Sequence, residues 1–145
     1  MLGRATLALL ALAATPAAAA DGLRPPQLRA TSGGVTVTPT SGSYCRSGAD
    51  QSLCADAAYP LPIKRRLPVR PGGRITIASD EPLSDVDTCL ETKRLRRFRC
   101  ADAAGSGTHW RVRLPHRLRR ADRLSIFVRY PQGDGDYALG LRVRR

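Results

Sequence analysis

The last third of the chain shows a regular alternation of apolar and polar residues, and this pattern constrains the fold more than any other feature. Every second residue is apolar over residues 110–114, 124–130 and 137–143. Successive side chains of a β-strand point to opposite faces, so these runs are typical of strands that bury one face and expose the other. Turn-forming residues, 131–135, separate the last two runs. The pattern predicts antiparallel strands joined by short turns.

Shorter alternating runs occur earlier, at residues 35–38, 67–69, 74–77 and 85–90. Several short strands separated by Pro and Gly turns, with almost no helical periodicity, favour a sandwich of two sheets. A length of 145 residues suits one domain. We therefore expect an all-β fold, a single antiparallel β-sandwich over residues 35–145.

Alternation also predicts which side chains of these strands face the core. On each run, the residues of the more apolar face should be buried, and those of the opposite face should be in water. The side chains expected inside are Ile75, Ile77, Trp110, Val112, Leu124, Ile126, Val128, Leu139 and Leu141.

The first 34 residues differ from the rest. Residues 1–20 combine the cation Arg4, a short apolar stretch and a run of small residues that ends at Ala20. This order is typical of a secretory signal peptide, so we expect cleavage near Ala20 and secretion to the extracellular or cell-envelope space. Residues 21–34 contain Pro and Gly pairs without alternation, and they predict an N-terminal tether.

Export sets the expectation for the four cysteines, Cys45, Cys54, Cys89 and Cys100. Thiols outside the cytosol are normally oxidised to disulfides, and four cysteines allow three pairings. Spacing favours the local pairing of Cys45 with Cys54 and of Cys89 with Cys100, because each link would then clip two neighbouring strands. A zinc site is disfavoured, because no two of these cysteines have the short spacing that such sites prefer.

Several segments together resemble a known class of domain. These segments are residues 42–45, 54–56, 67–73, 110–115, 126–130 and 135–143. Through them the chain is similar to small exported bacterial domains of uncharacterised function that fold as immunoglobulin-like β-sandwiches. This resemblance implies an immunoglobulin-like fold and export, and it assigns no functional residue.

Positive charge is the strongest functional signal in the sequence. Lys and Arg total 24 against 12 Asp and Glu, which gives a formal net charge of +12. Two clusters of arginine stand outside the clearest strands, and they predict a surface that binds polyanions. A coding bias that supplies Arg on ordinary solvated faces would produce the same excess and remains the alternative. The candidate residues are Arg94, Arg96, Arg97, Arg99, Arg117, Arg119 and Arg120.

Catalytic and cofactor motifs are not found in the sequence. Neither His109 nor His116 has a carboxylate placed by spacing to orient it, and no serine lies in a Gly-x-Ser-x-Gly motif. Asp134 and Asp136 match only part of a calcium-binding loop. We therefore expect no cofactor, no metal and no enzymatic activity.

The expected function is that of an exported binding or structural module. The partner we expect is an anionic cell-wall polymer, a polysaccharide or a membrane surface, and a protein partner stays open. Nucleic acid is disfavoured, because an exported protein meets the envelope first and aromatic residues for base stacking amount to only 5%. The alternative is a small secreted hydrolase or inhibitor whose site the sequence does not reveal.

Overall fold

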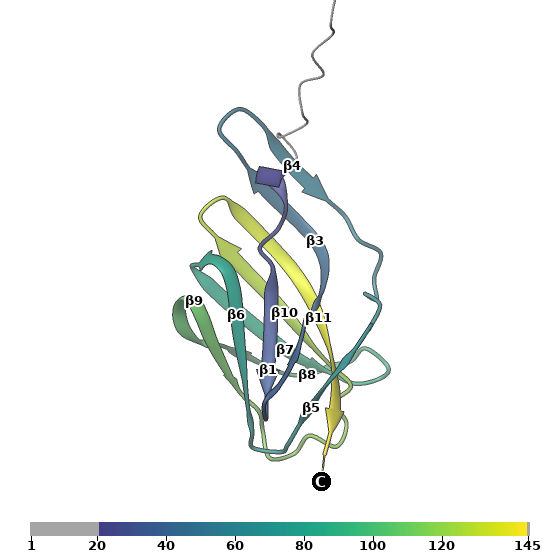
Figure 1. Cartoon of the computed structure of the whole chain (residues 1–145). Coiled ribbons are helices and arrows are strands. Elements are labelled where there is room, and N and C mark those ends of the chain that lie inside the picture. The colour runs from purple at the N-terminus through teal and green to yellow at the C-terminus, as the bar shows by residue number, and fades with distance from the viewer. Residues whose placement is uncertain (1–20, 145) are drawn as a thin grey trace, which may run out of the picture.

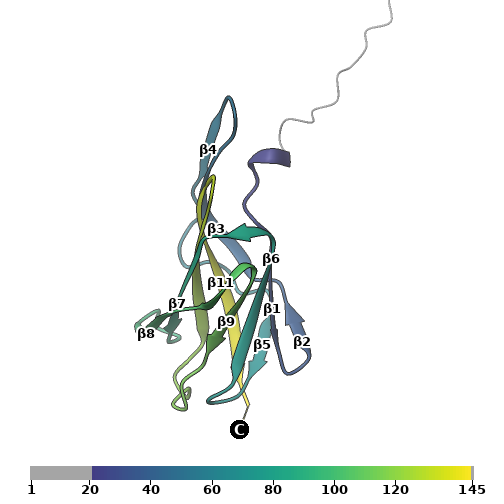
Figure 2. The ribbon, with the colours of Figure 1, turned by 90° about the vertical axis from the view of Figure 1, so that its left-hand side faces the viewer.

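Two β-sheets packed face to face make up the computed structural model, which describes residues 21–144 (Figure 1). The predicted signal peptide, residues 1–20, lies outside the described residues. Figure 2 shows β1, β2 and β6 on one side of the molecule and β7 and β8 on the other. The predicted all-β sandwich is confirmed. No helix of residues 21–144 is long and apolar enough to cross a lipid bilayer.

The smaller sheet has four strands in the order β2-β1-β6-β9, and every neighbouring pair is antiparallel. A short 3-10 helix, η1 (Asp21–Leu23), precedes it. Its strands are β1 (Leu28–Ser32), β2 (Val35–Val37), β6 (Arg74–Leu83) and β9 (Ala104–Arg113).

The larger sheet has seven strands, six of them in the order β4-β3-β11-β10-β7-β8. The seventh, β5, runs parallel to β11 and is the exception to the antiparallel pairing predicted from the sequence. The strands are β3 (Thr40–Ser47), β4 (Ser52–Ala55), β5 (Arg66–Val69), β7 (Asp85–Glu91), β8 (Arg97–Asp102), β10 (Arg123–Tyr130) and β11 (Gly133–Val143).

The core lies between the two sheets. All nine side chains that the alternation predicts to face inward are buried, and Ile75, Ile77 and Ile126 have no exposed surface. The indole of Trp110 keeps a hydrogen bond while buried, because its Nε1 donates to the carbonyl oxygen of Gly107 at 3.0 Å. The predicted strand faces are therefore confirmed.

The predicted tether over residues 21–34 is wrong, because β1 lies inside it and belongs to the smaller sheet. Leu28 and Ala30 are 1% and 0% exposed. The preceding residues are also fixed, since the Tyr137 hydroxyl donates to the carbonyl oxygen of Pro26 at 2.5 Å. The strand is short and its flanks are rich in Pro and Gly, so the sequence showed turn residues without a clear alternation.

Both predicted disulfides are confirmed: Cys45 is bonded to Cys54, and Cys89 to Cys100. In each case the two cysteines are directly opposite residues of a hairpin, β3 with β4 and β7 with β8. β4 and β8 are the two edges of the larger sheet. Each bond therefore fastens an edge strand to its inner neighbour.

We expect replacement of both Cys89 and Cys100 by serine to lower the free energy of unfolding by about 2–3 kcal/mol. The bond closes a loop of sequence separation 11 and restricts the unfolded chain, which is the main source of such stabilisation. Urea denaturation of the oxidised protein and the variant measures the difference. Equal unfolding midpoints would mean that pairing within β7 and β8 suffices without the bond.

Candidate anion-binding site

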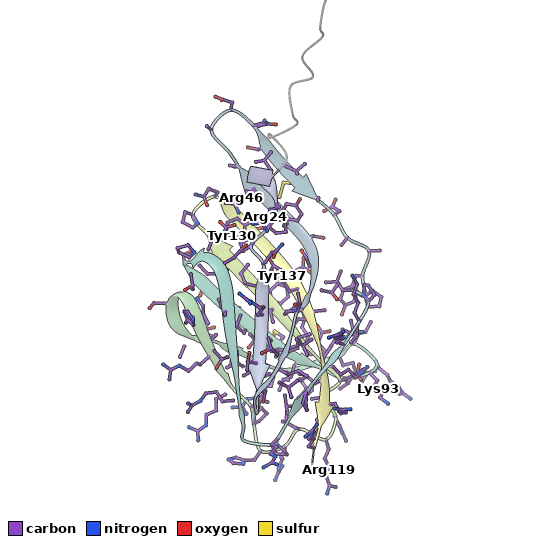
Figure 3. The ribbon with its side chains drawn as sticks, viewed as in Figure 1. Arg24, Arg46, Lys93, Arg119, Tyr130 and Tyr137 are labelled. Atoms are coloured by element: carbon purple, nitrogen blue, oxygen red, sulfur yellow. A yellow bond between two sulfur atoms is a disulfide. The ribbon has the colours of Figure 1, made fainter. Side chains whose placement is uncertain are left out.

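The two predicted arginine clusters lie on two connections that meet at one end of the sandwich, and the first cluster continues from its turn into β8, which holds Arg97 and Arg99. The first connection is the turn of residues 92–96 between β7 and β8, and the second is residues 114–122 between β9 and β10. Figure 3 shows Lys93 of the first and Arg119 of the second in the lower part of the molecule. The fold thus brings together cations that are about two dozen residues apart in the sequence.

The turn between β7 and β8 is held by hydrogen bonds to Thr92. Arg96 N donates to the Thr92 hydroxyl at 3.3 Å, and Leu95 N donates to the Thr92 carbonyl oxygen at 2.9 Å. Leu95 has a φ of 59°, a left-handed conformation that is unfavourable for a residue with a Cβ. The turn therefore leaves Lys93 and Arg94 exposed at a tip with a defined backbone.

The strain at Leu95 gives a direct prediction. We expect Leu95→Gly to be more stable than Leu95→Ala by about 1 kcal/mol, because both variants lose the side chain but only glycine adopts a positive φ without cost. Thermal or chemical denaturation of the two variants measures the difference. An alanine variant as stable as the glycine variant would show that this turn relaxes to an ordinary φ.

The second connection is fastened at three points. Gly72 N donates to the carbonyl oxygen of Pro115 at 3.0 Å, and Asp122 N donates to that of Glu91 at 2.9 Å. Between them the side chain of Leu118 is 1% exposed and belongs to the hydrophobic core. With Leu118 inside, the neighbouring side chains Arg117 and Arg119 are exposed. The Asp122–Glu91 bond joins this connection to the end of β7, where the other turn begins.

The two connections line a groove of about 800 Å³, which we call the arginine groove. A smaller hollow of about 390 Å³ adjoins it and shares Arg96, Arg119 and Arg120 with it. Among the described residues that line the two hollows, none is acidic. The groove is lined by Thr92, Arg96, Arg97, Phe98, His116, Arg117, Arg119 and Arg120, and the hollow adds Lys93, Arg94 and Ala121.

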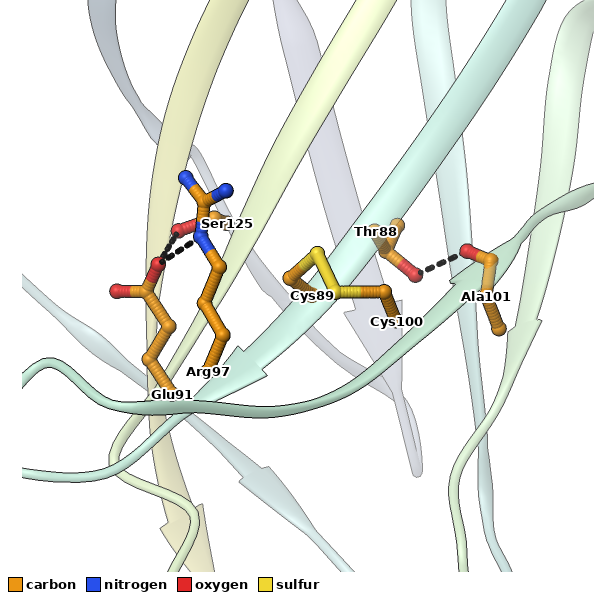
Figure 4. The surroundings of a disulfide bond; sticks show 7 residues. All are labelled: Thr88, Cys89, Glu91, Arg97, Cys100, Ala101 and Ser125. Atoms are coloured by element: carbon orange, nitrogen blue, oxygen red, sulfur yellow. Dashed lines mark hydrogen bonds and ion pairs between the residues drawn. A yellow bond between two sulfur atoms is a disulfide. The ribbon is translucent and has the colours of Figure 1, made fainter.

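Arg97 has a structural partner that the sequence did not reveal. Its Nε donates to the carboxylate of Glu91 at 3.3 Å (Figure 4). Its guanidinium also lies 5.2 Å from the centre of the Phe127 ring. Glu91 has no exposed surface and also accepts a hydrogen bond from the Ser125 hydroxyl at 2.7 Å. Arg97 therefore compensates a buried carboxylate, although it also forms part of the groove wall.

Tyr59 completes the surroundings of Glu91. The Tyr59 hydroxyl donates to the second carboxylate oxygen of Glu91 at 3.3 Å. Tyr59 is 61% exposed as a whole, but the loss of water around its hydroxyl, and after it the negative charge of Glu91, raises the pKa of Tyr59 above its usual value. The phenol thus remains a hydrogen-bond donor over a wider range of pH than an isolated tyrosine.

A β-bulge separates Arg99 from Arg97. Arg97 is opposite Glu91 and Arg99 is opposite Leu90, so Phe98 is an extra residue without a partner in β7. The neighbours Leu90 and Glu91 point to opposite faces of the sheet, and each arginine lies on the same face as its partner in β7. The bulge therefore places Arg99 and Arg97 on opposite faces of the sheet. Arg99 is exposed and lines neither hollow, so of the seven predicted residues it is the one that the fold leaves apart.

The remaining predicted arginines have no ion-pair partner within residues 21–144. Other arginines do, and the strongest example is Arg46, which binds both carboxylate oxygens of Glu81 at 2.6 and 2.7 Å. That hydrogen bonding raises the pKa of Arg46 and links the two sheets. The groove cations thus differ from arginines such as Arg46, whose charge is paired with a carboxylate inside the protein. Of the cations that line the groove or the adjoining hollow, those without an ion pair in the described residues are Lys93, Arg94, Arg96, Arg117, Arg119 and Arg120.

Sequence reasoning missed Phe98 and His116 of the groove and Lys93 of the adjoining hollow. Phe98 is 43% exposed, and an aromatic residue inside a run of arginines was the signal available for it. The ring of His116 packs against Gly72, whose φ of 70° and missing Cβ make room for it. Nothing in the sequence indicates that contact, because it depends on the turn between β5 and β6.

Carboxylates gather on the outer face of the larger sheet, where Asp87 and Asp102 share a hollow with Arg97. Asp87 and Asp102 are opposite residues of β7 and β8. Hydrogen bonding to Asp102, followed by burial and the charge of Asp85, raises the pKa of Asp87 above its usual value. Burial likewise raises the pKa of Asp136. Within the part of the chain that the structure describes, no group of three or more His, Cys, Asp or Glu side chains is placed to hold a metal ion.

The raised pKa of Asp87 predicts a pH-dependent effect of Asp87→Asn. The folded state binds this proton more tightly than the unfolded chain, so the corresponding stability is present at low pH and is lost as pH rises through the raised pKa. We expect the variant to be more stable than the parent by about 0.5 kcal/mol at pH 7, because like charges opposite each other repel. The gain should vanish below the ordinary pKa of 3.8. Denaturation curves at both pH values measure it, and a gain independent of pH would contradict it.

Comparison with known proteins adds no identity. No protein-family model matches the chain, and no curated protein matches it in sequence.

Proposed function

We propose that the protein is an exported, non-catalytic binding module that holds anionic groups of the cell envelope in the arginine groove. One observation carries the proposal: arginines of two clusters that are separate in the sequence line one groove and its adjoining hollow, and neither has an acidic residue among its described lining. Export and an immunoglobulin-like character rest on the leader-like residues 1–20 and on the resemblance stated above. Two disulfides suit an oxidising compartment.

The chemistry of the groove suits phosphate or carboxylate. A guanidinium stays charged at physiological pH and forms two parallel hydrogen bonds to such a group. A single exposed ion pair contributes only about 0–1 kcal/mol, so useful affinity needs several contacts at once. A ligand that repeats its negative charge meets this requirement, and its binding should weaken steeply with salt because counterions are released.

Poly(glycerol phosphate) is a suitable probe for this proposal. We expect the mature protein to bind it at low salt and to lose affinity as salt rises to the physiological range. Replacing Arg94, Arg96, Arg117, Arg119 and Arg120 by serine should lower the affinity about a hundred-fold and flatten the salt dependence. Calorimetric titration over a series of salt concentrations measures both quantities.

A charge-matched control separates the groove from net charge. Arg29, Arg111 and Arg113 are exposed arginines of the smaller sheet and line neither hollow. Replacing these three by serine should leave most of the affinity intact, whereas replacing Arg117, Arg119 and Arg120 should remove most of it. Equal losses in the two triple variants would mean that general positive charge acts without a site, and the proposal would then fail.

A further inference from the structure

We propose that the anionic partner of the arginine groove is the surface of a lipid bilayer, into which Phe98 inserts while the surrounding cations bind lipid phosphates. This inference rests on the proposed function and names the partner of the same site. It is carried by the position of Phe98, by the cations around it and by the free edge on which it lies.

Phe98 is an apolar side chain held in water. Its exposed fraction is 43%, and it is the unpaired residue of the bulge in β8. Bulges at sheet edges redirect a side chain, here one that lines the groove rather than the core. Val35, Leu53 and Tyr59 are also large, apolar and exposed, but none of them lines the groove.

The cations around Phe98 match the surface of an anionic bilayer. The arginine groove and the adjoining hollow share Arg96, Arg119 and Arg120. The positive surface extends to the tip of the turn through Lys93 and Arg94. The negative potential of anionic lipid headgroups attracts such clusters, and the attraction grows with each cation near the surface. Arginine also forms paired hydrogen bonds to lipid phosphate.

An exposed phenylalanine beside these cations favours a bilayer over a soluble polymer. A soluble polyanion satisfies the arginines but leaves most of the Phe98 ring in water. A bilayer interface satisfies both, because it offers phosphates at the level of the cations and acyl chains beneath them. β8 is the outermost strand of the larger sheet, and all of its residues are exposed, so no neighbouring strand prevents this approach.

Phe98→Trp tests insertion directly. The native Trp110 is 6% exposed in the core and supplies a constant background. With vesicles of phosphatidylglycerol and phosphatidylcholine, we expect the new tryptophan to shift its emission to the blue and to be quenched by lipids brominated on the acyl chain. Vesicles of phosphatidylcholine alone should give neither effect.

Leu53 provides the matched control. It is 41% exposed and lies on β4, the edge of the larger sheet opposite to β8. Leu53→Trp should show no shift and no quenching. Phe98→Ala should weaken binding to the anionic vesicles about ten-fold, whereas Leu53→Ala should leave vesicle binding unchanged.

The outcomes separate this inference from the proposed function. Binding to poly(glycerol phosphate) without vesicle binding, or vesicle binding without quenching of the Phe98→Trp emission, would overturn the membrane inference and leave the proposed function standing. If the wild-type protein bound neither poly(glycerol phosphate) nor the anionic vesicles, the membrane inference and the proposed function would both be overturned. Quenching of Phe98→Trp but not of Leu53→Trp supports the inference.

Discussion

Replacing Ile126 by alanine is expected to lower the free energy of unfolding by about 4 kcal/mol, the largest effect of any single truncation discussed for this protein. Ile126 has no exposed surface and lies on β10, between Thr88 of β7 and Tyr137 of β11. Its loss removes buried apolar surface and leaves a cavity in the core between the two sheets, whose packed strands cannot fully collapse into it. Chemical denaturation followed by circular dichroism measures the change.

Two arginines on the same sheet serve as controls for Ile126→Ala. Arg129 is exposed and lies 3.7 Å from Asp85, and Arg142 is exposed without an ion pair within residues 21–144. Each should change stability by no more than about 0.5 kcal/mol on replacement by alanine. If an arginine variant lost more stability than Ile126→Ala, the strand faces described above would be inverted.

The second large effect is expected at Glu91, where alanine should lower the free energy of unfolding by about 3 kcal/mol. The Glu91 carboxylate is fully buried and accepts hydrogen bonds from Ser125, Arg97 and Tyr59. Without it, the buried Ser125 hydroxyl loses its acceptor and a cavity remains where the side chain was. Arg97 also loses its partner, but its side chain is 54% exposed and water can solvate it, so the main cost comes from Ser125 and the cavity.

Asp50→Ala is the matched control for Glu91, because Asp50 is an exposed acid without an ion pair in the described part of the chain. The free energy of unfolding of Asp50→Ala should stay within about 0.5 kcal/mol of the wild-type value. Urea titrations of both variants measure the contrast. A Glu91 variant as stable as the Asp50 variant would mean that the network around Glu91 contributes no net stability.

The fold was predictable where alternation was long. The runs that contain Val112, Ile126 and Leu139 each show a clear apolar face, and the structure buries those faces. Prediction failed at β1 (Leu28–Ser32), because only two of its residues face the core and such a short alternation is not recognisable in the sequence. The strand is stabilised by its pairing with β6. The sequence also did not predict that β5 pairs in parallel with β11, because the pairing of two strands far apart in the sequence depends on the arrangement of the whole sheet.

The composition of the candidate site was predictable, and its geometry was not. The arginine runs are visible in the sequence, but their meeting depends on Leu118 in the core and on the backbone bond from Asp122 to Glu91. The separate role of Arg97 depends on a bulge that sets it opposite a buried glutamate. The spacing of residues along the sequence does not indicate that Asp122 and Arg97 both contact Glu91.

The central position of β11 has a consequence for how the protein reaches its native state. β11 is the last strand of the chain, and it pairs with β10 on one side and with β3 and then β5 on the other. Pairing between segments so distant in sequence is slow, because long loops must close before the contacts form. During synthesis, the larger sheet therefore stays open until residues 133–143 emerge, and its exposed edges are then available to other chains. We therefore expect the competition between this late closure and aggregation to limit the yield of folded protein.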